Sequence, residues 1–425
     1  MRAAPDYYSY YKATVNDSTR HPRLEGDEVA DVCIIGGGYT GLSTTLGLAE
    51  KGYAVTLLES FNIGWGASGR NGGQLIHGIG GKSYLRKKYG PDIEAFINRL
   101  CWRGHEIVEE NIKKYDIECD LKYGYLDCAF KTRQMSDLEE EFEHYDSLGM
   151  GDRFRLVSAN ELSDYIGTSV YKGGLYNDRD AHLHPLNLCL GEARAAAGLG
   201  AKIYEQSQVL SITHGREPRV HTEHGSIRAK IVVLAGNAYH LLEQKHVGGI
   251  LFPAGTYIIA TEPLGDNMAH DVLPADVAVC DLNEMLNYYR LSSDKRMLFG
   301  GRCNYSGREP RDIKASIKPR MLQIFPQLKG TRIDFQWGGK IGIVINRIPQ
   351  LGRIGDNVYY AQGYSGHGIN QTHIVGEILT AAICGQMEDF DVYAKAKHWK
   401  IPAPRWVGNN MVALGMMYYR IRDLL

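Results

Sequence analysis

The chain has 425 residues, a net charge of −1, 44% hydrophobic residues and 23% charged residues. A charge this close to zero argues against a nucleic-acid-binding protein and against a polybasic membrane-binding protein, because both need an excess of positive charge. The balanced composition excludes a chain that is disordered throughout, and the length predicts about two or three domains.

The cysteines and the apolar segments of the chain indicate in which cellular compartment the protein is expected. None of the eight cysteines forms a CxxC pair or a zinc-like spacing, so we expect reduced thiols and no metal site. The first 30 residues lack the apolar segment of a secretory signal. The uncharged run 32–49 contains five glycines, so we expect a strand, a loop and a helix there rather than an integral membrane segment. These features predict a cytoplasmic protein.

The first elements have the order of a βαβ unit. Residues 1–27 are polar and rich in tyrosine, and we expect them to form an N-terminal arm. Residues 31–35 form an apolar strand, apolar residues then recur at helical spacing as far as Ala49, and residues 54–58 form a second buried strand. Two short apolar strands joined by a helix are typical of a parallel sheet.

The loop between the first strand and the helix carries the pattern Gly36-x-Gly38-x-x-Gly41. Glycines at these positions allow a tight turn and a close approach of the backbone to a pyrophosphate, which the free N–H groups at the start of the helix can bind. Glu59 ends the second strand, where its carboxylate can accept hydrogen bonds from ribose hydroxyls. The order of strand, helix and acid favours a dinucleotide site over a glycine-rich turn without a ligand.

A second glycine-rich segment, residues 64–74 (GWGASGRNGGQ), follows Glu59 almost directly. A domain that binds NAD would usually begin another helix after a short loop. A long glycine-rich loop can instead run along the isoalloxazine ring of FAD, with backbone N–H groups facing the ring. The alternative is a flexible surface loop, which Trp65, Arg70 and Asn71 make less fitting. The segment therefore favours FAD over NAD.

Between residue 75 and residue 361 the pattern alternates between helices and strands. His182 and His184 lie two residues apart before Pro185, a spacing that favours a structural turn over metal ligation. We expect helices over 91–115, 185–199 and 311–325, strands near 203, 209–212, 231–235, 341–345 and 357–361, and a strand-rich region over 251–300.

The third glycine-rich segment, residues 362–370 (QGYSGHGIN), enters a long helix that we expect from Gly366 to Cys384. The N-terminus of a helix with small residues can direct the positive end of its dipole at the pyrimidine end of a flavin, where reduction places negative charge. His367 could contact the flavin or the substrate, and it could equally cap the helix or pack against it.

Elements of nucleotide-binding type are thus interrupted by a strand-rich block. This predicts an α/β protein, α+β overall, with a discontinuous Rossmann-like FAD-binding domain and an inserted substrate domain on a mainly antiparallel sheet. The expected division is an N-terminal arm over 1–27, the FAD-binding domain over 28–82, 170–240 and 338–388, the substrate domain over 83–169 and 241–337, and a C-terminal extension over 389–425.

The three glycine-rich segments, in this order, resemble the D-amino-acid oxidase/glycine oxidase superfamily of flavoproteins. The stretches HLHPLNL (182–188), AGNAY (235–239) and FPQLKG (325–330) extend the resemblance over nearly the whole chain. The resemblance implies that an amine is oxidised to an imine, which water hydrolyses to an aldehyde plus ammonia or an amine. It also implies dioxygen as the electron acceptor, giving hydrogen peroxide, although a dehydrogenase with another acceptor remains open.

The resemblance also implies roles for individual residues. Tyr289 falls where related oxidases place an active-site tyrosine, and His367 and Lys340 complete the candidate catalytic set. Lys340 and Arg347 could reach a remote carboxylate of the substrate, with a surface position as the alternative. The residues expected to hold FAD are Gly36, Gly38, Tyr39, Thr40, Gly41, Glu59, Ser60, Gly66, Ala67, Ser68, Arg70, Asn71, Gly72, Gly73, Gln74, Val209, Gly236, Gly363, Gly366, His367 and Gly368.

Two departures from the sarcosine-oxidase branch of this superfamily refine the expectation. That branch carries arginines after the position of Gly69 that clamp a small carboxylate, whereas this chain has NGGQL at 71–75. It also attaches FAD to a cysteine near the position of 337–339, where this chain has none, so we expect non-covalent FAD. We therefore expect an FAD-dependent amine oxidoreductase that acts on a long amine such as a gamma-glutamylated polyamine. A D-amino-acid or N-methyl-amino-acid oxidase or dehydrogenase is the enzymatic alternative, and a non-catalytic FAD-binding module is the other.

Overall fold

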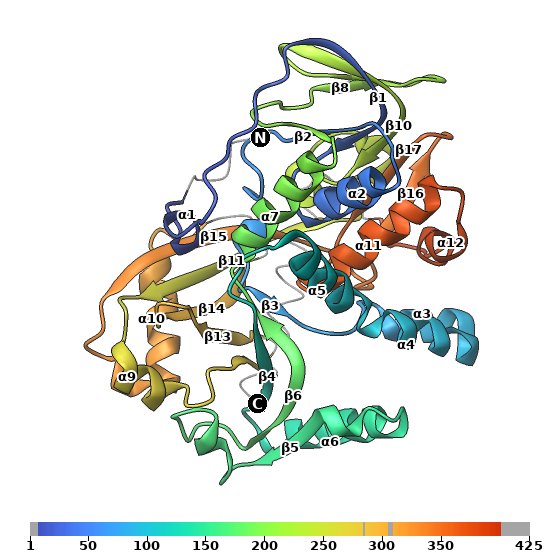
Figure 1. The fold of residues 1–425 in the computed structure, drawn as a ribbon. Helices are drawn as coiled ribbons and strands as arrows, with labels where there is room; N and C mark the ends of the chain where they lie inside the picture. Colours follow the sequence, from blue (N-terminus) through green and yellow to red (C-terminus); the bar gives the residue numbers. More distant parts are fainter. Residues whose placement is uncertain (1–6, 284, 305–308, 401–425) are drawn as a thin grey trace.

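The computed structural model describes residues 7–283, 285–304 and 309–400, and the chain in these ranges folds around two β-sheets (Figure 1). The outer parts of the expected N-terminal arm and C-terminal extension, residues 1–6 and 401–425, lie outside the described residues. The mixture of one largely parallel sheet and one largely antiparallel sheet confirms the predicted fold class.

Sheet A has the strand order β16-β17-β10-β1-β2-β7. All neighbours from β7 to β17 are parallel, and β16 is antiparallel at the edge. Residues Val32–Ile35 of β1 and all of β2 are buried, as expected for parallel strands that are covered on both faces. The strands are β1 (Gly26–Ile35), β2 (Val55–Leu58), β7 (Lys202–Tyr204), β10 (Gly225–Leu234), β16 (Gln350–Ile354) and β17 (Val358–Gln362), with the hairpin β8 (Ser211–Thr213) and β9 (Arg219–His221) extending from β10.

Helices α2 (Tyr39–Glu50), α7 (Pro185–Gly198) and α11 (Gly368–Ile383) lie side by side against sheet A, with α2 in the middle (Figure 1). The helices α2 and α11 approach closely because each has a glycine in the contact. A Cβ at Gly376 would lie 2.4 Å from Oγ of Ser43, and a Cβ at Gly47 would lie 2.9 Å from Oγ1 of Thr380. This close contact fixes the start of α2 relative to the start of α11.

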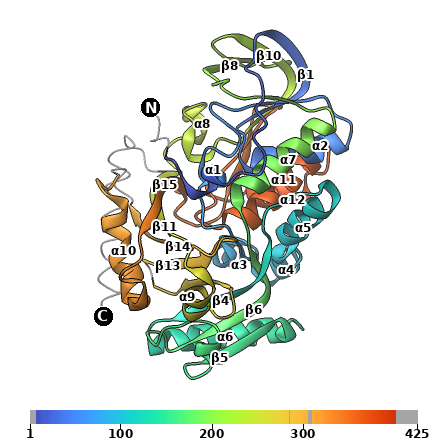
Figure 2. The ribbon, with the colours of Figure 1, turned by 60° about the vertical axis from the view of Figure 1, so that its left-hand side comes forward.

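Sheet B has the strand order β15-β11-β14-β13-β12-β4-β6-β3, with β5 paired to β6. Its pairs are antiparallel except for β12 and β4. The helices α6, α9 and α10 lie around this sheet (Figure 2). The strands are β3 (Gln74–Leu75), β4 (Lys122–Ala129), β5 (Phe154–Ser158), β6 (Gly173–His182), β11 (Phe252–Thr261), β12 (Ala278–Asp281), β13 (Asn287–Leu291), β14 (Met297–Asn304) and β15 (Ile333–Ile343). The remaining helices of the described ranges are α1 (Tyr10–Ala13), α3 (Lys82–Tyr89), α4 (Glu94–Cys101), α5 (Arg103–Tyr115), α6 (Thr132–Ser147), α8 (Gln244–Val247), α9 (Gly265–Val272), α10 (Ile313–Ile324) and α12 (Glu388–Ala394).

Several expected boundaries differ from the observed ones. The expected helix over 91–115 is two helices, α4 and α5, which meet at Trp102. The strand β6 pairs with β4, so residues 173–182 belong to sheet B although the expected FAD-binding domain included them. The strand β15 likewise lies wholly in sheet B and crosses the boundary that we expected at residue 338. Strand pairing joins segments that are distant in sequence, so composition along the chain does not locate these boundaries.

The described helices include none that is long and apolar enough to cross a membrane. The cysteines whose side chains the structure describes are free thiols, and most of them are buried.

The predicted structural turn at His182 and His184 is present. Nδ1 of His184 accepts a hydrogen bond from the backbone N–H of Asn187 (3.1 Å) and caps α7, and Nε2 lies 3.1 Å from Oγ1 of Thr14. Burial, together with the nearby Arg290, lowers the pKa of His184 to about 3. His184 is therefore neutral in the folded protein over the whole range in which an unfolded histidine titrates.

This difference predicts a pH dependence of stability. Between about pH 6.5 and about pH 3 the unfolded state binds a proton at His184 that the folded state does not, so the free energy of unfolding falls as the pH falls. His184→Asn keeps an acceptor for the cap but cannot titrate. We expect urea unfolding between pH 7 and pH 5 to show a slope that is shallower by up to about 1.4 kcal/mol per pH unit in this variant. The exposed His246→Asn should keep the wild-type slope, and equal slopes in all three proteins would contradict the assignment.

Candidate active site

A cavity of about 710 Å³ is lined by residues of both sheets and of all three glycine-rich segments. The topology of sheet A brings the segments together. The strands β1, β2, β10 and β17 are parallel, so the loops that follow Ile35, Leu58, Leu234 and Gln362 leave the sheet at the same edge. Ligands of open parallel sheets bind at this carboxyl edge.

The first glycine-rich segment forms a turn that only glycine fits. Gly36 has φ +117°, and a Cβ there would lie 2.9 Å from the backbone carbon of Ala235. A Cβ at Gly41 would lie 1.9 Å from the carbonyl oxygen of Gly36, so its absence lets the turn pack onto α2. Gly38 caps α2 without a side-chain acceptor and lines the cavity. A helix N-terminus presented by bare backbone fits a phosphate group.

Glu59 lies beside this turn at the cavity wall. Its Oε2 accepts the backbone N–H of Gly37 (2.7 Å), and its Oε1 accepts that of Phe61 (2.9 Å). Burial raises the pKa of Glu59, and these two backbone donors oppose the rise. The carboxyl group is thus fixed where hydroxyl groups of a dinucleotide could reach it, and the donor set of this end of the cavity fits FAD.

The second segment is an anchored loop and not a flexible one. The indole N–H of Trp337 donates to the carbonyl of Arg70 (3.0 Å), and Nε of Arg290 donates to the carbonyl of Gly72 (2.8 Å). Oδ1 of Asn71 accepts the backbone N–H of Gly73 (2.8 Å) inside the loop. The anchors come from strands β13 and β15 of sheet B, so the loop ties the two sheets together at the cavity.

The third segment places the start of α11 at the cavity. His367 is the N-cap residue, and both it and Gly368 line the cavity. A Cβ at Gly368 would meet nothing within 4 Å, so open space adjoins the first turn. The side chain of His367 is exposed to the cavity, and desolvation by the surrounding protein, with smaller effects of Lys82, Arg347 and His77, lowers its pKa to about 4. The imidazole is therefore neutral at pH 7, and the positive end of the helix dipole faces the cavity.

Most of the residues predicted to hold FAD line this cavity. Gly41 and Gly73 lie behind its wall at close backbone contacts, and Gly363 shapes the turn before α11 with φ +86°. The predicted residues that line the cavity are Gly36, Gly38, Tyr39, Thr40, Glu59, Ser60, Gly66, Ala67, Ser68, Arg70, Asn71, Gly72, Gln74, Gly236, Gly366, His367 and Gly368.

Two further predicted site residues, Val209 and Lys340, are not part of the cavity wall. Val209 packs in the core of sheet A and does not line the cavity. Lys340 is also absent from the cavity wall, because it lies between Gly339 and Ile341 in β15, and alternate residues of a strand face opposite sides. Its backbone N–H donates to the hydroxyl of Tyr239 (2.7 Å). Neither residue lines the cavity.

The tyrosine predicted from β13 is displaced by one residue. Tyr289 is 1% exposed, stacks on Phe299 and hydrogen-bonds to the hydroxyl of Tyr171 (3.1 Å), all within the core of sheet B. Its neighbour Tyr288 lines the cavity instead. Tyr288 has room there because a Cβ at Gly300 would lie 2.1 Å from its ring. The alternation of β13 thus assigns Tyr288, and not Tyr289, to the site.

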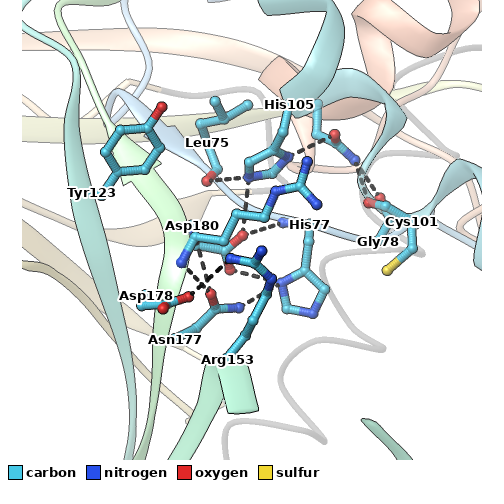
Figure 3. Close-up of polar contacts among 12 residues, drawn as sticks. Leu75, His77, Gly78, Cys101, His105, Tyr123, Arg153, Asn177, Asp178 and Asp180 are labelled. Carbon is cyan, nitrogen blue, oxygen red and sulfur yellow. Dashed lines mark hydrogen bonds and ion pairs between the residues drawn. The ribbon is translucent and has the colours of Figure 1, made fainter. Parts of the chain in front are cut away.

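A buried polar network that the sequence motifs did not indicate supports the wall of the cavity (Figure 3). Asp180 lies between His77 and His105: Nδ1 of His77 lies 2.7 Å from its Oδ2, and Nε2 of His105 lies 3.0 Å from its Oδ1. The hydroxyl of Tyr145 lies 2.7 Å from Nε2 of His77, and both residues line the cavity. Burial alone would raise the pKa of Asp180, but the two histidines lower it to about 2.

The same network reaches α11 through Asn370, whose Oδ1 lies 3.0 Å from Nδ1 of His105 and whose Nδ2 donates to the carbonyl of Gly78 (2.8 Å). It therefore links β6, α5, α6 and the residues after β3 to the first turn of α11. These residues come from segments 77–78, 105, 145, 180 and 370, and no local pattern in the sequence connects them.

Comparison with known proteins gives the same assignment as the geometry. The profile described as "DAO: FAD dependent oxidoreductase" matches residues 31–382. The chain is 40% identical to gamma-glutamylputrescine oxidoreductase from Escherichia coli over 98% of each chain. It is 38% identical to the probable oxidoreductase OrdL from Haemophilus influenzae over 98% of this chain and 97% of that one. These matches confirm the resemblance that the glycine-rich segments indicate.

Solved structures share the fold at lower identity. Glycine oxidase from Geobacillus kaustophilus aligns with a TM-score of 0.69 and 20% identity, over 84% of this chain and 95% of that chain. L-Proline dehydrogenase from P. horikoshii aligns with a TM-score of 0.70 and 23% identity, over 84% and 94%. At these identities the comparison supports the fold alone.

The network around Asp180 predicts a specific loss of stability. Asp180→Asn replaces a charged acceptor of two histidines by an amide, and hydrogen bonds to charged groups are worth about 1.5–3 kcal/mol each. We expect the free energy of unfolding in urea to fall by about 2–3 kcal/mol. The neighbouring Asp178→Asn is the control. The side chain of Asp178 is half-exposed, and its ion pair to Arg153 is long (3.6 Å) and therefore weak. A loss of similar size in both variants would contradict the role of the network.

Proposed function

We propose that this chain, which belongs to the family of FAD-dependent oxidoreductases, oxidises the primary amine of a gamma-glutamylated polyamine such as gamma-glutamylputrescine. The observation that carries the proposal is the 40% identity to gamma-glutamylputrescine oxidoreductase over 98% of both chains. The amine loses a hydride from carbon and a proton from nitrogen, and water converts the imine to an aldehyde and ammonia. Dioxygen is the proposed acceptor of the two electrons, which gives hydrogen peroxide.

The two sheets divide the work in this proposal. Gly36, Gly38 and Glu59 at the edge of sheet A would hold the ADP half of FAD, and the loop 66–74 together with the start of α11 would border the flavin ring. Bound FAD supplies a ring that takes a hydride from the carbon next to an amine nitrogen. The positive end of the α11 dipole would then stabilise the negative charge that reduction adds. Sheet B would supply the substrate wall, with Tyr288 on it.

The cavity also favours the reactive form of the substrate. A primary amine with a pKa near that of lysine, about 10.4, is mostly charged at pH 7, and an ammonium has no lone pair to assist the loss of hydride. Enclosure disfavours the charged form and lowers this pKa. His367, which is neutral at pH 7, can accept a hydrogen bond from the amine without adding a positive charge. The protein's part is therefore orientation and desolvation.

Substrate preference tests the proposal. Because residues 71–75 read NGGQL and contain no arginine, a small amino acid would find no carboxylate clamp in this stretch of the loop. We expect kcat/KM for gamma-glutamylputrescine to exceed that for sarcosine, glycine or D-alanine by at least about tenfold. Anaerobic bleaching of the flavin gives the same comparison without dioxygen. Sarcosine or D-alanine as the best substrate would support the alternative amino-acid oxidase, and no bleaching by any amine would support a non-catalytic module.

Cofactor binding gives a second test. Glu59→Ala removes a buried acceptor at the expected ribose position, which should raise the Kd of FAD by about tenfold or more. Titration of the apoprotein with FAD measures this constant, and the exposed Glu25→Ala is the control. Acid precipitation should release all of the flavin, since the proposed binding is non-covalent. An unchanged Kd would remove Glu59 from the site, and flavin retained in the pellet would show a covalent bond.

A further inference from the structure

Besides Glu59, Arg70 and Asp281, four charged side chains from four different elements line the cavity. Lys82 begins α3, Asp127 lies in β4, Glu141 lies in α6, and Arg347 lies in the turn between β15 and β16. None of the four belongs to the glycine-rich segments that would hold FAD. The cavity therefore has a charged wall in addition to the wall expected for the cofactor.

The two acidic residues and Lys82 border the same part of this wall. Nζ of Lys82 lies 6.0 Å from the centroid of the Tyr145 ring, and Glu141 precedes Tyr145 by about one turn of α6. Burial raises the pKa of Asp127 well above its usual value, and the charge of Glu141 raises it further. Two carboxyl groups are thus within electrostatic reach of each other and close to an ammonium group.

The two basic residues, Lys82 and Arg347, both influence His367 at the start of α11. After desolvation, the charges of Lys82 and Arg347 are the next largest causes that lower the pKa of His367. The residues before α3 adjoin the turn that carries Arg347, since a Cβ at Gly80 would lie 2.5 Å from the carbonyl oxygen of Arg347. Both basic side chains are therefore within electrostatic reach of His367 at the start of α11.

The four side chains have no ion-pair partner among the described residues. By contrast, Arg86 in the same helix as Lys82 pairs with Glu94 at 2.6 Å. Lys82, Asp127 and Glu141 are partly buried and Arg347 is exposed, so a ligand in the cavity can reach all four side chains. A ligand that carries both an ammonium and a carboxylate would supply the missing partner to each.

We infer that Asp127 and Glu141 bind the α-ammonium group, and Lys82 and Arg347 the α-carboxylate, of the glutamyl head of the substrate. The inference rests on the proposed function and adds the residues that distinguish a gamma-glutamyl amine from an unmodified diamine. A diamine has no carboxylate and would leave Lys82 and Arg347 unpaired. Binding of the ammonium lowers the pKa of Asp127, since a nearby positive charge favours the ionised carboxylate.

The test combines two variants with three amines on the FAD-loaded enzyme. The variants are Glu141→Gln and Lys82→Met, and their controls are Glu140→Gln and Lys87→Met, which change exposed residues of the same two helices. The amines are gamma-glutamylputrescine, glutarylputrescine, in which hydrogen replaces the α-ammonium, and the α-carboxamide of gamma-glutamylputrescine. All three keep the amine that is oxidised, so kcat/KM reports the head group.

The expected losses are selective. Glu141→Gln should lower kcat/KM by at least about tenfold for the two amines that keep the ammonium, and by less than about threefold for glutarylputrescine. Lys82→Met should show the corresponding loss for the two amines that keep the carboxylate and spare the carboxamide. The controls should stay within about twofold of the wild type for all three amines.

Two failures are distinguishable. Equal losses with all three amines, or no loss in either variant, would overturn the head-group site while the wild type still oxidises gamma-glutamylputrescine. A wild-type enzyme that oxidises none of the three amines would overturn the proposed function, and with it the head-group site.

Discussion

The geometry of the cavity depends on one buried cation, Arg290. Its guanidinium is 4% exposed and, among the described residues, has no carboxylate partner. It donates instead to the carbonyls of Gly72 (2.8 Å) and Leu183 (2.7 Å). A buried charge is tolerated only when its donors are satisfied, so these carbonyls must converge on one point of sheet B. This requirement fixes the loop 64–74 against β13 and keeps the cavity open between the two sheets.

The same cation sets the protonation of its surroundings. After burial, its charge is the next cause that lowers the pKa of His182 and of His184 to about 3, so both histidines are neutral when the protein is folded. Neutral His184 can accept the cap hydrogen bond of α7, which imidazolium could not. The loop on one side and the helix cap on the other therefore depend on a single arginine, whose removal would leave several carbonyls without a donor.

The sequence allowed good predictions where the constraint is local. The turn at Gly36 and the acid at Glu59 follow from the order of strand, helix and strand, because a βαβ unit fixes both positions. Prediction from the sequence failed where contacts between distant segments determine which residues face the cavity. Whether Tyr288 or Tyr289 faces the cavity depends on which face of β13 meets the core, and residues 287–290 are polar or aromatic on both faces. The network around Asp180 joins five distant segments, and a single sequence carries no signal for such contacts.

The two walls of the cavity can also change independently. The wall formed by the glycine-rich segments presents mainly backbone atoms. Backbone atoms offer the same contacts to every substrate, so this wall cannot discriminate between substrates. Side chains of sheet B and of helices α3 and α6 make the other wall, and they come from segments outside the βαβ unit. Substitutions there alter charge without altering the turns that hold a dinucleotide. Under the proposed function, the charged wall would therefore select the substrate, and the glycine wall would position the cofactor that supplies the chemistry.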